Sequence, residues 1–549
     1  MSLRNRLVLP ILLSGLAALA GCGSTNSAVP PPSGAFSNTD FSGTYTFSIE
    51  GSDPNGGMSI AGSFVACGCT GGTIAAGGVV DFDDASLVAP GSAIGGNSTY
   101  GIQKDGRGTA NLFITPTGGT AFLVTVDFVL TSSSHGLITR YDGAGTGSGT
   151  IDLQASAVAQ SSLDVAPYAF TLSGSDSSSD IISTVGSLTL NSSGTITAGV
   201  EDCNVTGTVL YQSTLSGSVL VGSGTTPGSA TILTACSSGA LTFDVYTIDS
   251  THLKLIESDG AAFLVGDAFA QTSATIPQGG LVFTMAGLDS LSSSGAPFVS
   301  GGTVVSDGAS QLTGGLEDVN DDTTIDGGVT PAVPLNFGGT FVASPSGSGR
   351  FQLALSNFFG GTNFAAYPSS GGIFLVQIDQ GIGAGVTSGM ALPQTAGAAI
   401  AATQGYGLNN QGVDFNTGSE LDEIAQFTTT STGMTGLLDD NDGGSVNTSN
   451  VNGTYTAADS NGAGTATIGS RLQSINYYAA DSSTVLFIST DPNQIAAGVF
   501  EAQSAPGGDN ESPAVRPRAL PMFRALPRSR KGAVRSQVQV RPAKQLGSN

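Results

Sequence analysis

The chain has 549 residues, of which 39% are hydrophobic, 11% are charged and 80 are glycine. Because Thr, Val, Ser and Gly dominate while Glu, Lys and Arg are scarce, the composition disfavours long helices and disorder and predicts a packed all-β protein. The net charge is −24, and nine of the 17 Lys and Arg lie after residue 504. So acidic a body repels phosphate groups, which excludes nucleic acid as its partner.

The first residues carry the features of an export signal. Two arginines precede a short apolar run, Leu7–Ala20, which is too short for a lasting transmembrane helix. The tetrad that ends this region, Leu19-Ala20-Gly21-Cys22, resembles the lipobox of bacterial lipoproteins. The resemblance implies that residues 1–21 are removed as a signal peptide and that Cys22 is lipidated, with palmitate among its acyl chains. The mature protein would then be exported and attached to a membrane.

The residues after the lipobox indicate the destination and a tether. Gly23 stands where, in many lipoproteins, an aspartate would suggest retention at the inner membrane, so the outer membrane or the cell surface is favoured. Residues 22–40 consist mainly of Gly, Ser, Thr, Asn, Ala and Pro, a composition that cannot bury a core. We expect them to form a flexible tether that holds the folded part away from the lipid.

A short pattern, Gly-x-x-Asp, returns four times and divides the following region into modules. The four copies end at Asp81, Asp202, Asp318 and Asp439. Their spacing of about 120 residues is the size of a single domain. We interpret each aspartate as closing a turn at the end of the third strand of its module, with the apolar residue after each glycine in the core.

Within each module, apolar and polar residues alternate over short runs such as 122–130, and Gly-rich turns separate the runs. About eight strands with short connections predict an antiparallel meander, closed as a small up-and-down barrel or folded over as a sandwich. At pattern level this resembles the lipocalin and avidin type of barrel, although no sequence signature of either family is present. We expect four tandem modules as beads with limited freedom, at residues 41–154, 167–271, 280–395 and 403–504.

The last 45 residues, 505–549, change abruptly to Pro, Arg, Ala and Val without alternation. This composition predicts a disordered basic tail. Two interpretations stay open. The tail contacts anionic envelope polymers or the acidic modules, or it is a solvated extension without a partner.

Four cysteines remain besides Cys22. The compartment of an exported protein is oxidising and permits disulfides. Cys203 and Cys236 lie in one module on neighbouring strands, and we predict that they pair. Cys67 and Cys69 flank a glycine at a predicted hairpin turn, where a local bridge and a soft-metal site are both open interpretations.

Acidic turns make calcium a candidate ligand, because Ca²⁺ is bound by oxygen atoms. The candidate ligands are Asp318, Asn320, Asp322, Asp439 and Asn441. The EF-hand pattern fails, since the sixth position counted from Asp318 is not glycine. Asp and Asn also cap turns by hydrogen bonds to the backbone, so we assign no metal and no cofactor.

Catalytic residues are not evident. The two histidines, His135 and His252, occupy equivalent places in the first two modules, and the other modules lack them. A catalytic triad needs a base beside a nucleophile, and a glycosidase needs a carboxylate pair. Neither arrangement can be picked out from the sequence, so no catalytic residue is assigned and a protein that is not an enzyme is predicted.

Together these features predict a lipid-anchored envelope or surface protein whose non-catalytic β modules act as a spacer or an adhesive array. Its expected partners are the membrane, through the acyl chains on Cys22, and an envelope polymer or surface ligand. An alternative is that the modules bind a small apolar or glycan ligand, and a hydrolase is the third hypothesis. Barrel interiors filled by Phe and Leu would favour the spacer or adhesive array, and open cavities would favour ligand binding.

Overall fold

The computed structural model describes residues 34–506, apart from short gaps at 85, 156, 177–179, 235, 238, 290–295, 322–323, 327–333, 346, 382–383 and 470–473. The prediction of an all-β fold is confirmed: the regular structure of the described residues is strand, with two short 3-10 helices, η1 (Asn38–Asp40) and η2 (Gln160–Asp164). No helix in the described part of the chain has the length and apolarity needed to cross a bilayer.

The first two modules each contain nine antiparallel strands. The strands of module 1 are β1 (Ser42–Asp53), β2 (Gly56–Cys67), β3 (Gly78–Asp84), β4 (Val88–Ile94), β5 (Thr99–Ile102), β6 (Arg107–Thr115), β7 (Phe122–Leu130), β8 (His135–Arg140) and β9 (Thr146–Leu153). Those of module 2 are β10 (Tyr168–Asp176), β11 (Ile181–Leu190), β12 (Ile196–Val205), β13 (Thr208–Thr214), β14 (Ser216–Leu220), β15 (Gly228–Leu233), β16 (Ala240–Asp249), β17 (His252–Glu257) and β18 (Ala262–Ala270). In both modules the first strand pairs with the last.

Modules 3 and 4 repeat this plan. The strands of module 3 are β19 (Gly279–Leu288), β20 (Pro297–Ser306), β21 (Gln311–Asp321), β22 (Thr324–Ile325), β23 (Leu335–Ala343), β24 (Phe351–Ser356), β25 (Asn363–Ser369), β26 (Gly372–Gln377) and β27 (Val386–Pro393). Those of module 4 are β28 (Gly405–Asp414), β29 (Ser419–Thr429), β30 (Gly433–Asp442), β31 (Ser445–Tyr455), β32 (Ala463–Thr467), β33 (Ile475–Ala479), β34 (Thr484–Ser489) and β35 (Gln494–Ala502). Each of the four sheets corresponds to one of the modules expected from the sequence, and β19 begins one residue before the expected limit at 280.

The sheets are barrels rather than sandwiches. Module 4 is a closed barrel of eight strands, and module 3 closes through the pairing of β20 with β21. Module 1 is nearly closed, since only two residues of β4 pair with β6. In module 2 the edge strands β13 and β14 are separated by Leu215 alone, whose amide donates to the Gly199 carbonyl on β12. Closure leaves few unpaired edges, which is how an isolated sheet avoids association.

Alternation along the strands gives every barrel two packed faces. On β7, Val124, Val126 and Phe128 point into the interior of module 1, whereas Val129 points outward. Each barrel has an apolar interior of this kind. The outward apolar residues would face water if the modules were separate beads, and their burial therefore requires neighbouring modules.

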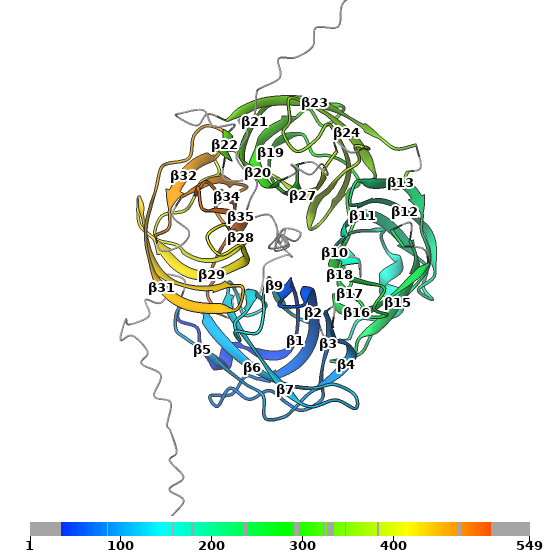
Figure 1. The fold of residues 1–549 in the computed structure, drawn as a ribbon, viewed down its shortest axis with the longest axis vertical. Helices are drawn as coiled ribbons and strands as arrows, with labels where there is room; N and C mark the ends of the chain where they lie inside the picture. Colours follow the sequence, from blue (N-terminus) through cyan, green and yellow to red (C-terminus); the bar gives the residue numbers. More distant parts are fainter. Residues whose placement is uncertain are drawn as a thin grey trace, which may run out of the picture.

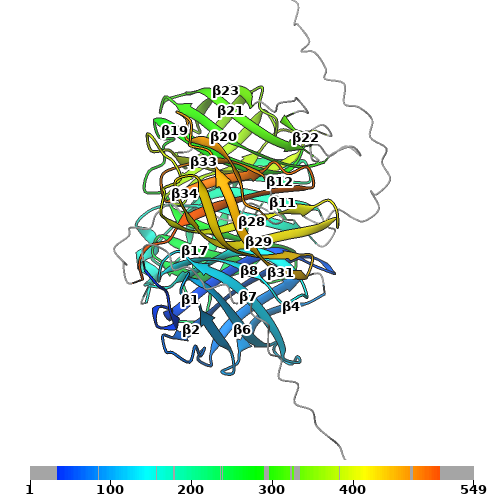
Figure 2. The same ribbon diagram turned by 90° about the vertical axis from the view of Figure 1, so that its left-hand side faces the viewer.

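The four modules form a ring, as Figure 1 shows, instead of a string of beads. Strand β2 packs on β17 and β18, β11 packs on β25 to β27, and β20 packs on β33 to β35. The ring closes because β28 and β29 of module 4 pack on β7, β8 and β9 of module 1. One apolar cluster contains outward residues from all four modules, among them Val129, Val185, Val282 and Ile488. Figure 2 shows the ring turned by 90°, with strands of module 1 at the bottom and strands of module 3 at the top.

Candidate functional site at the module junctions

The aspartate of the repeated Gly-x-x-Asp pattern joins one module to the next. It lies on the outer face of its barrel, and at three junctions it accepts a hydrogen bond from a buried tyrosine of the following module. The bonds run from Tyr246 to Asp81 (2.6 Å), from Tyr367 to Asp202 (2.6 Å) and from Tyr478 to Asp318 (2.7 Å). These contacts link residues about 160 positions apart in the sequence.

This placement corrects the sequence interpretation of the pattern. Asp81 lies in the middle of β3 and not at its end, so the aspartate does not close a turn. The residue after the glycine was expected in the core, but Val79, Leu316 and Leu437 are only half-buried, and Val200 alone is buried. The reason is the alternation of the strand: the neighbours of each aspartate point inward, and the aspartate itself faces the adjacent barrel.

The junction that closes the ring differs from the other three. In module 1 the position that the tyrosine has in the other modules is occupied by Val129, six residues before β8 begins. The motif aspartate of module 4, Asp439, instead accepts a hydrogen bond from Thr448 at 2.6 Å, and the Arg107 guanidinium lies 3.7 Å away. In module 3 the arginine at the equivalent position, Arg350, contacts Asp202 with two nitrogens.

A second repeated contact comes from the residue two positions after each motif aspartate. In modules 2, 3 and 4 it is a buried asparagine whose amide donates to backbone carbonyls of the next module. The bonds run from Asn204 to Gln377 and Gly385, from Asn320 to Ser489, Asp491 and Gln494, and from Asn441 to Arg140 and Gly145. In module 1 the equivalent residue is Asp83, which lacks the amide and can donate only when its carboxyl group is protonated.

The calcium candidates therefore belong to these junctions. The oxygens of Asp318 and Asp439 accept hydrogen bonds from hydroxyls, and the amides of Asn320 and Asn441 are directed at carbonyls. Asp322 lies outside the described residues. In the described part of the chain, no group of three or more His, Cys, Asp or Glu is placed to hold a metal ion.

Carboxyl groups face one another at both junctions of module 1. Asp83 lies against Glu257 of module 2, and burial raises the pKa of Asp83 to about 7 and that of Glu257 to about 9. Asp244 lies against Asp81, and burial raises its pKa to about 7. At the closing junction, burial and the charge of Asp439 raise the pKa of Asp127 to about 7.

A third repeated contact involves the glutamine that follows the last strand of each module. Three of these side chains donate to a carbonyl of the next module, at the position after the junction tyrosine or its valine equivalent. The bonds run from Gln271 to Pro368 (2.9 Å), from Gln394 to Ala479 (2.8 Å) and from Gln503 to Leu130 (2.9 Å). Gln154 is the exception, because its amide donates to Thr46 of its own module at 2.8 Å.

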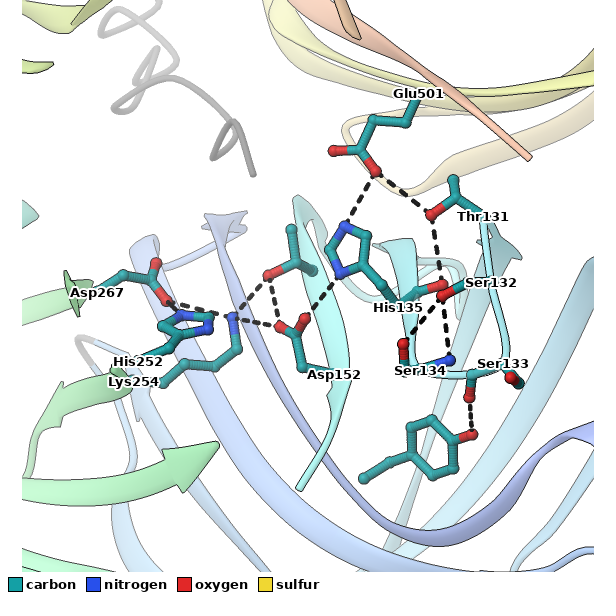
Figure 3. A network of polar contacts seen from close by, with 12 residues as sticks. Thr131, Ser132, Ser133, Ser134, His135, Asp152, His252, Lys254, Asp267 and Glu501 are labelled. Carbon is teal, nitrogen blue, oxygen red and sulfur yellow. Dashed lines mark hydrogen bonds and ion pairs between the residues drawn. The ribbon is translucent and has the colours of Figure 1, made fainter. Parts of the chain in front are cut away.

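The two histidines meet in one buried network near the centre of the ring, which Figure 3 shows from close by. His135 Nδ1 lies 2.7 Å from Asp152, and His252 Nε2 lies 2.9 Å from Asp267. Lys254 lies between the two carboxylates, with its Nζ 3.1 Å from Asp152 and 3.2 Å from Asp267. Its ammonium also donates to the Thr150 hydroxyl at 2.6 Å.

This network links side chains of three modules. His135 Nε2 lies 3.0 Å from Glu501 of module 4, so both ring nitrogens face carboxylates and neither faces a hydroxyl nucleophile. Lys254 is fully buried among acceptors, and the His252 ring stacks on Phe269. Side chains from modules 1, 2 and 4 thus meet in a buried place, where the Lys254 ammonium pairs with the carboxylates of Asp152 and Asp267.

The cysteine prediction can be compared with the structure directly. The disulfide between Cys203 and Cys236 is confirmed, and it joins β12 to the loop after β15. Cys67 and Cys69 also form a disulfide, which decides between the two interpretations left open by the sequence. Cys22 lies outside the described residues.

The barrel interior of module 3 leaves little room for a ligand. The interior of module 3 holds a cavity of about 50 Å³, lined entirely by apolar side chains such as Phe283, Phe337 and Phe364. Ligand pockets are usually about 300–1,000 Å³. A cavity this small is a packing gap in a filled core.

Several junction residues were not recognised in the sequence although a signal for them exists. The glutamines recur at the ends of all four modules, and tyrosines recur at matching places in modules 2, 3 and 4. The joining of the two histidine–aspartate pairs gave no signal, because Lys254, Asp152 and Glu501 come from three separate modules.

Comparison with known proteins adds no identification. No family model matches the chain, and no curated protein matches it. Among solved structures, the siderophore receptor PirA from Pseudomonas aeruginosa aligns with 84% of this chain and 79% of its own length, at 9% sequence identity and a TM-score of 0.08. A similarity this low carries no argument about fold or function.

Proposed function

We propose that this protein is a lipid-anchored protein of the cell envelope or cell surface whose four β modules form a rigid, non-catalytic platform for adhesion. The observation that carries the proposal is the closed ring. Repeated contacts of aspartate, asparagine and glutamine side chains link each module to the next. A ring holds its outer surfaces in fixed positions, which suits attachment, whereas a spacer needs extended reach.

Two further observations favour adhesion over the other hypotheses. The one barrel cavity described above is far smaller than a ligand pocket, which disfavours a carrier of apolar molecules inside the barrels. Both ring nitrogens of His135 and the Nε2 of His252 lie beside carboxylates, an arrangement that favours a structural role over that of a base beside a nucleophile.

The anchor is tested by changing Cys22 to serine. The wild-type protein should partition with membranes and incorporate a palmitate analogue supplied to the cells, because the lipobox directs acylation of this cysteine. The Cys22→Ser protein should lose the label and appear in the soluble or secreted fraction. Equal labelling of both proteins would contradict the anchor.

The adhesive role is tested on whole cells. Cells that display the protein should attach to surfaces coated with envelope or host material more than cells without it, and cells producing the Cys22→Ser protein should not. Equal attachment of all three kinds of cell to every surface tried would contradict the adhesive role, whatever the purified protein binds.

A further inference from the structure

The two disulfides described above differ in what they hold together. Cys203 is fully buried, and its bridge to Cys236 spans 33 positions and joins β12 to the loop after β15. The bridge between Cys67 and Cys69 spans two positions at the end of β2, where Cys67 is exposed and Cys69 is half-buried. A disulfide stabilises mainly by restricting the unfolded chain, and a longer loop is restricted more. The short bridge therefore adds little to the stability of the fold.

The turn that carries the short bridge is held by its backbone. The Cys67 amide donates to the Thr73 carbonyl at 3.1 Å, and the Gly72 amide donates to the Cys69 carbonyl at 3.0 Å. Gly68, between the cysteines, has a φ of +59°, and a Cβ at this position would lie 2.5 Å from a side chain of β1, so only glycine fits. These features keep the turn in place whether the two sulfur atoms are bridged or reduced.

The two sulfur atoms have unequal surroundings. Cys67 Sγ accepts hydrogen bonds from the backbone amides of Cys69 at 3.1 Å and Thr73 at 3.3 Å. The Tyr100 hydroxyl lies 3.6 Å from the same sulfur. Cys69 Sγ lies 3.6 Å from the Thr73 hydroxyl. Backbone amides directed at one atom stabilise negative charge there, so the charge released when the bridge opens is best held on Cys67.

We propose that the Cys67–Cys69 bridge is a thiol–disulfide exchange site that oxidises a pair of neighbouring thiols on another polypeptide. An exposed bridge is open to attack by a thiolate, and the fold does not depend on this one. The groups that contact the two sulfur atoms are amides and hydroxyls, which do not repel an approaching thiolate as a carboxylate would. The exchange goes beyond the proposed adhesive platform and does not depend on it, since it consumes one bridge per chain and requires no turnover.

The exchange balances within the protein and its partner. A partner thiolate attacks Cys69 Sγ, and a new sulfur–sulfur bond forms as the bond between Cys67 and Cys69 breaks. The electron pair leaves on Cys67 Sγ, where the two amides lie. The second thiolate of the partner then attacks the partner's own sulfur in this mixed disulfide, and Cys69 leaves as a thiolate. The partner is oxidised to a disulfide, and the protein is reduced to a pair of thiols after both sulfur atoms take up protons.

Reduced glutathione tests the site on the mature full chain, in the absence of oxygen, with alkylation and peptide mass spectrometry as the readout. Cys67 and Cys69 should be reduced at least about tenfold faster than Cys203 and Cys236, which serve as the internal control, because access governs the rate. Early samples should carry glutathione on Cys69 and the alkyl group on Cys67. Equal rates for the two bridges, or glutathione on Cys67 instead, would overturn the proposal.

A peptide with two cysteines tests the oxidising activity. Incubated with the oxidised chain in the absence of oxygen, the peptide should gain one disulfide per chain and leave Cys67 and Cys69 as thiols. The double variant Cys67→Ser, Cys69→Ser should oxidise no peptide, and its urea midpoint should equal that of wild type, because the bridge adds little to the fold. A peptide that stays reduced, equal oxidation by the double variant, or a clear drop in its urea midpoint would each contradict the exchange site.

Discussion

The junction of modules 2 and 3 and the junction of modules 1 and 2 use the same positions with opposite chemistry. At the first, Asp202 is paired with the guanidinium of Arg350 and with Tyr367, and an asparagine amide meets carbonyls. At the second, Asp81 faces another carboxyl group, and Asp83 replaces the asparagine. The backbone plan of the two junctions is shared, so the difference lies in side-chain charge.

This difference indicates that one junction can lack charge compensation when the other junctions keep the ring closed. Module 1 is also held by module 4, through the Gln503 amide and the bonds of Asn441. Two junctions of unequal strength can therefore coexist around one module. Changes at the two junctions should therefore differ in their effect on stability. Substitutions at the junction of modules 2 and 3 should lower it, and one substitution at the junction of modules 1 and 2 should raise it.

The largest effect is expected at the compensated junction. Arg350→Ala removes the charge that balances Asp202 in a buried place and should lower the free energy of unfolding by about 3–5 kcal/mol. Urea denaturation followed by circular dichroism measures this change. The comparison is Arg107→Ala, whose guanidinium lies 3.7 Å from Asp439 across the closing junction and 3.0 Å from Asp105 in its own module, so its cost reports both contacts. A loss below about 1 kcal/mol for Arg350→Ala would show that the pair is not the basis of this junction.

The uncompensated junction should make the ring sensitive to pH. The folded-state pKa values of Asp83 and Asp244 are raised to about 7, and that of Glu257 to about 9, by burial. The folded protein then keeps protons that the unfolded chain releases above about pH 4. Stability from these groups is complete below that pH and falls as the pH rises through 7 to 9. Urea midpoints measured from pH 5 to 9 should decrease, and a flat or rising series would contradict the assignment.

A single substitution should convert the second junction toward the first. Asp83→Asn supplies the amide found at the equivalent position of the other three modules, where it donates to carbonyls of the next module. At pH 8 this change should raise the free energy of unfolding by about 1–2 kcal/mol and reduce the slope of stability with pH. The matched control, Asn320→Asp, should do the reverse at its own junction. Equal stability of Asp83→Asn and wild type at pH 8 would argue against an unfavourable interaction between the carboxyl groups of Asp83 and Glu257.

The parts of this molecule that the sequence predicts are those determined by neighbouring residues. Alternation of Val124, Val126 and Phe128 is a local pattern, and it predicts strands and module limits because the interior of each barrel is filled from its own sequence. The ring depends on outward residues such as Val129, and an outward apolar residue in a strand does not tell which surface covers it. The anchor at Cys22 depends on sequence alone.

The junction contacts illustrate the same limit. The motif aspartates were visible as a repeat, but each partner lies in another module, as Tyr246 does for Asp81. An aspartate in a Gly-rich sequence is also typical of a turn. The sequence therefore favoured a turn over a contact with a residue of another module. Spacing alone could have matched the tyrosines to the aspartates, since both recur at about the module period in modules 2, 3 and 4.

The smallest expected effects compare two junction tyrosines. Tyr478→Phe removes the hydroxyl that donates to Asp318, which pairs with no arginine among the described residues, and should cost about 1–2 kcal/mol. Tyr367→Phe should cost less, because Asp202 keeps both contacts with Arg350. The two variants are compared by urea denaturation at one pH, and combining Tyr367→Phe with Arg350→Ala should cost more than the sum of the two single changes, since either group covers for the other. Equal costs for both tyrosines, with additive behaviour, would mean that the arginine does not compensate the aspartate and that the junctions differ only in packing.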